Sequence, residues 1–210
     1  MEHTLAGIRN RVQVDKLDDE EFDSSVIDNF INDTQRDIFL NAELPFMEKI
    51  FSGTINPGAT IFRFPTDLSM IQSQVIVSPT GVAKDIEKGY IDFKDFNMLF
   101  PIPSSNAPSE ITKWTLYGGK MLLSAPTDVE YTMSTFYIKT ADLLTEDADV
   151  PEVPEEFNEL LVLGAYKRVL ERNEDFDLSN VVGGEYERLF GMMVSRYGFR
   201  KSGPIIMKRK

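Results

Sequence analysis

The chain has 210 residues, of which 42% are hydrophobic and 27% charged, so it can form one large domain or a core with an inserted subdomain. Its formal net charge of -12 argues against nucleic acid as the main ligand, because nucleic-acid binding draws on clustered lysine and arginine. Cysteine is absent, which excludes disulfides and thiolate zinc sites, and no apolar run approaches the roughly 18 residues that would span a bilayer.

The N-terminal residues predict a short helix followed by an acidic loop. Leu5, Ile8 and Val12 lie at helical spacing, and the start of the chain lacks the apolar region and cleavage site of a secretory signal peptide. Residues 15–23 contain six acidic side chains against one lysine, which is typical of a solvated loop or of the start of a helix.

A second helix is predicted from the N-cap cluster Asp23-Ser24-Ser25 to about Ala42. Leu44-Pro45-Phe46 interrupts this helix, and Gly53 and Pro57-Gly58 predict a loop before the next element. The expected apolar stripe comprises Val26, Ile27, Phe30, Ile31, Ile38 and Phe39, with Thr34 as a small polar member.

At about residue 59 the pattern changes to alternating β-branched and aromatic residues, which predicts a mostly antiparallel β subdomain. Gly118-Gly119 supplies the positive φ angles of a tight turn and so predicts a hairpin. The pattern is ambiguous near Asp92–Leu99, where we favour a short helix. The predicted strands cover residues 60–64, 72–77, 114–117, 120–123 and 128–139.

Helical patterns return in the last third of the chain. Pro154 is expected in the first turn of a helix, and Glu155-Glu156 suits the positive end of the helix dipole. Apolar residues surround most of this helix, which predicts a central position in the fold. A last helix is expected from about Gly184, with Gly183-Gly184 as a helix boundary, and Gly198 should end it.

Together these patterns predict an α+β protein with four parts. Residues 1–57 and 141–200 form a helical core of N-terminal helices and two long C-terminal helices. Residues 58–140 form the inserted antiparallel β subdomain, and residues 201–210 form an extended C-terminal tail.

The C-terminal tail is basic, whereas the rest of the chain is acidic. No acidic residue follows Glu187, and the apolar triplet Ile205-Ile206-Met207 is too short to form a core of its own. The tail therefore favours docking on a partner, although a disordered basic extension has the same composition. The candidate partner-binding residues are Arg200, Lys201, Ile205, Ile206, Met207, Lys208, Arg209 and Lys210.

The sequence carries no signature of catalysis, of a metal site or of a bound cofactor. His3 is the only histidine and is expected to be an incidental surface residue, so a Ser-His-Asp triad is excluded. Neither glycine-rich nucleotide-binding motif occurs. The 34 carboxylates could supply a glycosidase pair, but they fall in predicted loops and helix starts, where nothing marks one as an acid.

Four aromatic residues of the β subdomain allow two interpretations. Trp114, Tyr117, Tyr131 and Tyr137 could form a platform for a glycan or a nucleic-acid base, or they could belong to the core of a sheet. Their positions on predicted strands favour the core.

The order of several short motifs is more informative than any one of them. In chain order the motifs are Leu5-x-x-Ile8-Arg9, Ile27–Asn32, Phe64–Leu68, Tyr117–Lys120, Tyr131–Tyr137, Val153–Phe157, Ala165-Tyr166 and Glu171–Asp175. This order resembles that of the head-to-tail adaptor (connector) proteins of tailed bacteriophages, over nearly the whole chain.

The resemblance implies a structural virion protein at the head–tail junction, made in the host bacterial cytoplasm. It implies a ring of twelve copies beneath the portal protein, joined to tail or nozzle proteins, through which DNA passes without specific binding. It also implies that the C-terminal tail docks on the portal, without any membrane contact. The alternative is another virion or tail component whose β subdomain binds a ligand such as a glycan.

Overall fold

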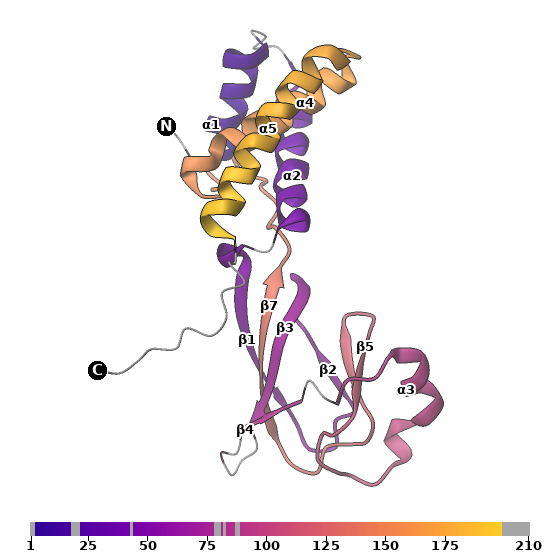
Figure 1. Cartoon of the computed structure of the whole chain (residues 1–210). Coiled ribbons are helices and arrows are strands. Elements are labelled where there is room, and N and C mark those ends of the chain that lie inside the picture. Colours follow the sequence, from indigo (N-terminus) through magenta and orange to yellow (C-terminus); the bar gives the residue numbers. More distant parts are fainter. Residues whose placement is uncertain are drawn as a thin grey trace, which may run out of the picture. The chain divides into compact units, whose positions relative to one another are not determined.

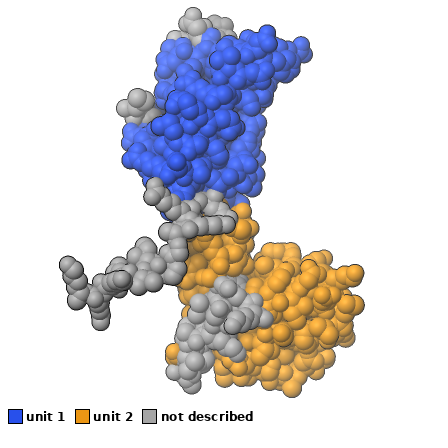
Figure 2. Space-filling view, viewed as in Figure 1, with its two compact units in different colours: residues 1–47, 140–210 blue, residues 48–139 orange. Residues whose placement is uncertain are grey.

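The computed structural model describes residues 3–17, 22–42, 44–77, 81, 83–86 and 89–198. The chain divides into two compact units, residues 1–47 with 140–210 and residues 48–139, coloured separately in Figure 2. The described part of the first unit is helical, and the second contains two small antiparallel sheets (Figure 1). These elements confirm the predicted α+β class. Residues 48–57 were predicted to belong to the helical core, whereas in the structure they belong to the unit that contains the sheets.

The first two helices begin where the sequence predicts. The Thr4 side chain accepts a hydrogen bond from the Gly7 amide at the start of α1 (Leu5–Asn10). Asp23 caps α2 (Ser24–Asn41) by accepting from the Ser25 amide at 2.9 Å. The chain does not become a loop after α1, because a π-helical segment, Arg11–Leu17, continues it. The predicted acidic loop is thus partly helical, and residues 18–21 lie outside the described residues.

The central helix of the first unit is α4 (Asn158–Arg172), which follows a 3₁₀ turn at Glu155–Phe157. All residues from Leu160 to Ala165 are buried, which confirms the predicted central position. Gly164 lies against Thr34 of α2, where a Cβ atom would be 2.2 Å from the Thr34 methyl group. Thr34 is therefore more than a tolerated polar residue, since α2 and α4 are too close at this pair to leave room for a side chain at position 164.

The last helix, α5, runs from Phe176 to Tyr197 and is longer than predicted. Asp175 caps it, so Gly183-Gly184 lies within the helix and the prediction of a boundary there is wrong. The two glycines have low helix propensity, and the packing of Val182 and its neighbours against α4 stabilises the helix in their place. Gly198 ends the helix, as predicted.

The four-stranded sheet has the order β1-β7-β3-β4. Its strands are β1 (Glu48–Ile55), β7 (Tyr131–Lys139), β3 (Leu68–Val77) and β4 (Ala83–Asp85). The loop predicted around Gly53 is wrong, because β1 pairs with β7 along its whole length. A Cβ atom at Gly53 would meet the Phe62 ring at 2.8 Å, so glycine here serves close packing rather than a turn.

The three-stranded sheet has the order β2-β6-β5, with β2 at Ile61–Arg63, β6 at Lys120–Leu123 and β5 at Trp114–Tyr117. Gly118 and Gly119, with φ of 58° and 70°, form the predicted turn between β5 and β6. The short helix α3 (Phe93–Leu99) confirms the helix favoured near this position, with Asp92 as its cap. The core of this unit comprises Ile55, Phe62, Phe64, Ile86, Ile111, Trp114, Met121, Leu123, Tyr131 and Met133.

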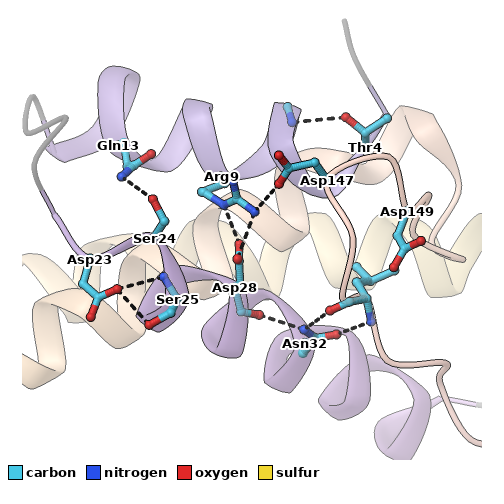
Figure 3. A network of polar contacts seen from close by, with 12 residues as sticks. Thr4, Arg9, Gln13, Asp23, Ser24, Ser25, Asp28, Asn32, Asp147 and Asp149 are labelled. Carbon is cyan, nitrogen blue, oxygen red and sulfur yellow. Dashed lines mark hydrogen bonds and ion pairs between the residues drawn. The ribbon is translucent and has the colours of Figure 1, made fainter.

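Polar contacts hold the segment that returns from β7 to α4 against α1 and α2 (Figure 3). Arg9 donates to both Asp28, at 2.7 Å, and Asp147, at 2.8 Å. The buried side chain of Asn32 donates to the Leu144 carbonyl and accepts from the Leu144 amide. Gln35, also buried, makes the same pair of bonds with the Asp142 carbonyl and the Glu152 amide. The side-chain amides of Asn32 and Gln35 thus provide hydrogen-bond partners for the backbone of a segment that forms neither helix nor strand.

We predict that Gly164→Ala lowers the free energy of unfolding by roughly 1–3 kcal/mol, because the new methyl group overlaps Thr34. Gly184→Ala is the matched control, since a Cβ atom there meets nothing within 4 Å. The control should raise stability by about 0.5–1 kcal/mol through helix propensity. Urea unfolding followed by circular dichroism measures both changes. Equal effects of the two substitutions would contradict the close approach of α2 and α4.

Candidate interaction site

The residues that sequence analysis assigned to partner binding all lie in the C-terminal tail. Residues 199–210 are outside the described residues, so the structure places none of the eight candidates. The structure does describe the end of α5, at Tyr197 and Gly198, from which the tail continues. The surroundings of Tyr197 therefore define the point at which the tail leaves the helical unit.

Tyr197 is held by two aromatic rings from other parts of the helical unit. Its ring lies edge-on to Phe46 and to Phe157, with centroids 6.1 Å apart in both pairs. Phe46 in turn packs edge-on to Phe39 of α2. We call Phe46, Phe157 and Tyr197 the C-terminal anchor, because these contacts connect the last turn of α5 to two other segments of the unit.

Polar contacts reinforce the C-terminal anchor. The Tyr197 hydroxyl donates to the Glu156 carboxylate, and the Arg196 guanidinium pairs with the same carboxylate at 3.2 Å. The hydrogen bond to Glu156, with burial second, raises the pKa of the Tyr197 phenol. Glu156 was expected only to complement a helix dipole, but it also connects the start of one helix to the end of another.

Charge differs sharply between the tail and the rest of the chain. Residues 199–210 contain five basic residues and no acidic one, so their formal charge is +5. The total of -12 then leaves -17 for residues 1–198 (-12 minus 5). The C-terminal anchor therefore lies at the boundary between a strongly acidic body and a basic extension.

The single histidine is not the incidental surface residue that was predicted. His3 is half-buried, and its Nδ1 atom is 2.6 Å from the Asn158 side-chain oxygen. It therefore contacts the first turn of α4 instead of standing free on the surface. Among the described residues, no group of three histidine or acidic side chains is placed to hold a metal ion.

A cavity of about 210 Å³ lies between α2, α4 and α5. Four of its charged side chains form ion pairs, Asp37 with Arg168 and Lys167 with Glu171, and Glu187 also lines it. Burial, aided by the charges of Asp37 and Glu187, raises the pKa of Tyr186 in its wall to about 12. The phenol stays protonated at neutral pH, and the arrangement offers no obvious acid, base or nucleophile.

The aromatic residues of the β unit belong mainly to its core. Trp114, Tyr131 and Tyr137 are 3–4% exposed, which confirms the interpretation as core residues. Tyr117 is exposed, but its ring stacks on Phe93 with centroids 4.0 Å apart. The four residues do not form a shared platform for a glycan or a base.

None of the helices in the described part of the chain is both long and apolar enough to cross a bilayer.

Comparison with known proteins identifies the family. The family described as SU10 adaptor protein matches residues 3–207, nearly the whole chain. The chain therefore belongs to the SU10 adaptor protein family, which makes it a bacteriophage adaptor protein and confirms the resemblance seen in its motifs. None of the curated proteins matches the chain.

The C-terminal anchor was not predicted from the sequence. Phe46 was noted only as part of a tripeptide that interrupts a helix, and Phe157 as the end of the motif Val153–Phe157 and as an apolar residue of the helix that follows Pro154. The one available signal was that Tyr197 is the last of five residues at helical spacing in the last helix, namely Tyr186, Leu189, Phe190, Met193 and Tyr197. No local pattern connects three aromatic residues that are about 40 and 110 positions apart.

We predict that Glu156→Gln loosens the last turn of α5, because the glutamine removes the charge that holds both Arg196 and the Tyr197 hydroxyl. Amide hydrogen exchange in that turn should become several-fold faster. Glu155→Gln is the matched control, since Glu155 shares the helix N-terminus but contacts neither Arg196 nor Tyr197 among the described residues. Equal acceleration in both variants would indicate a helix-dipole effect alone.

Proposed function

We propose that the protein is a head-to-tail adaptor that forms a ring beneath the portal and joins it to the tail, leaving a channel for DNA. The observation that carries the proposal is the family match over residues 3–207. The ring has twelve copies in this proposal, and its neighbours are the portal protein on one side and tail or nozzle proteins on the other. The protein acts structurally, in the virion, without catalysis.

The charge of the chain suits this function. A channel whose wall is acidic repels the phosphate backbone, so DNA can slide through it without binding. Residues 1–198 carry a formal charge of -17, which provides many carboxylates for such a wall. The absence of clustered basic residues outside the tail agrees with passage of DNA rather than recognition of it.

The tail is the proposed portal-docking segment. It consists of the eight residues named above, Arg200, Lys201 and Ile205 to Lys210, and follows an α5 end that the C-terminal anchor holds. Burying each of its three large apolar side chains on a partner is worth roughly 1.5–3 kcal/mol. The flanking basic residues favour an acidic groove on the portal.

We predict that deleting residues 202–210 leaves a folded protein that no longer attaches firmly to the portal. The deletion begins beyond Gly198, the cap of α5, so the melting temperature by circular dichroism should be unchanged. Co-sedimentation with the portal should be lost. Undiminished co-sedimentation would exclude portal docking by the tail, and a large fall in melting temperature would show that the tail belongs to the fold of its own chain.

We predict that the isolated protein sediments as a monomer or loose oligomer and forms rings mainly on the portal. Like charge opposes self-association when no partner is present, since each copy carries a formal charge of -12. Sedimentation velocity in moderate salt, and electron microscopy with and without the portal, would measure this. A stable closed ring of the isolated protein at low micromolar concentration would contradict the prediction.

A further inference from the structure

The second unit, residues 48–139, carries two exposed surfaces that lack charge. The first is the part of the outer face of the four-stranded sheet that β1, from Ile50 onward, and β7 form, and it lies away from the core of the unit. Cross-strand partners Ile50 and Phe136 are 67% and 40% exposed there. The open sheet face comprises Ile50, Ser52 and Thr54 of β1 with Thr132, Ser134 and Phe136 of β7, all at least partly exposed.

The second surface lies at the end of α3. Met98, Leu99 and Ile102 are 62–68% exposed, and we call them the α3 patch. They belong to a run, residues 96–109, that contains no charged residue, although 27% of the chain is charged. Large apolar side chains grouped this way on a surface usually mark an interaction site.

The six residues of the open sheet face are likewise uncharged, and the exposed Glu48, two residues before Ile50 on β1, lies where this uncharged surface ends. Residues 50–62, which contain most of β1, and residues 131–138 of β7 include no acidic or basic residue. The face presents serine, threonine and apolar side chains to solvent, on a chain whose net charge is -12. Two copies of this chain can approach through such surfaces without bringing like charges together.

The two surfaces are on opposite sides of the unit. Figure 1 shows α3 beyond β5 and β2, on the side away from β1 and β7. The inner face of β7 packs on the core through Tyr131 and Met133, so the open sheet face points away from α3. One copy therefore cannot use its own α3 patch to cover its own open sheet face.

We infer that the open sheet face of one copy binds the α3 patch of the next, so that the β unit is a contact between neighbouring subunits. Two different surfaces on opposite sides of a subunit make a head-to-tail contact, which closes into a ring when the rotation between copies allows it. The contact buries apolar residues that one copy alone leaves in water. The inference rests on the proposed ring and assigns the inserted β unit a role in it.

Cross-linking of cysteine variants tests this contact, because the natural chain has no cysteine. Ser52→Cys lies on the open sheet face and Ser104→Cys beside the α3 patch, and both positions are exposed. Full-length variants, one carrying a size tag, are mixed, assembled on the portal and treated with a short bismaleimide. We expect cross-linked dimers in which a Ser52→Cys chain is joined to a Ser104→Cys chain. Either variant alone should give none.

The possible outcomes separate the contact from the ring. Rings without a cross-link between the two variants would overturn the contact and leave the ring intact. Dimers of Ser52→Cys alone would also overturn it, since they would indicate that two sheet faces meet. Failure to form rings with the unmodified chain would overturn both the proposed function and the contact.

Lysine substitutions give a second measurement with a matched control. Ile50→Lys and Leu99→Lys place a charge in the contact, and each should lower the yield of rings about tenfold or more, because an unpaired charge is costly to bury. Leu143→Lys is the control, since Leu143 is 64% exposed in the helical unit. Circular dichroism of each variant establishes that it is folded. Normal ring yields from folded Ile50→Lys or Leu99→Lys would contradict the inferred contact.

Discussion

The close approach of α2 and α4 at Thr34 and Gly164 is the constraint on which the helical unit depends. A side chain at position 164 would overlap Thr34, so only glycine allows this spacing. Leu160–Ala165, Val169 and Leu170 of α4 are buried as well, so the position of α4 determines where α5 can pack. Because α5 ends at the C-terminal anchor, the same packing also sets the point from which the basic tail continues.

The inserted β unit is compatible with this core because its two ends lie together. Glu48 at the start of β1 is paired with Ile138 near the end of β7, so the chain leaves and returns at neighbouring positions. The return segment is then held by the side chains of Asn32 and Gln35, which substitute for a regular backbone ladder. An insertion closed in this way can supply a surface for assembly without altering the helical core.

Much of the fold could be predicted from local patterns. Asp23 caps a helix where the sequence predicts a cap, a short helix forms where one was favoured near Asp92–Leu99, and Gly118-Gly119 forms the turn of a hairpin. The interpretation failed at glycines that serve packing. Gly53 resembles part of a loop but lies inside β1, because the neighbouring Phe62 ring leaves no room for a side chain there. Gly183 resembles a helix boundary but lies inside α5, because packing against α4 stabilises the helix at this position.

The sequence by itself determined the composition, the caps, the helical and strand periods and the order of motifs that indicates an adaptor. These features depend on neighbours within a few residues, so they can be recognised without a structure. Only the tertiary structure decided that Phe46, Phe157 and Tyr197 meet and that the charge-free surfaces of the β unit face opposite ways. Both depend on contacts between distant segments, because an apolar residue has the same local pattern whether its own chain covers it or a partner does.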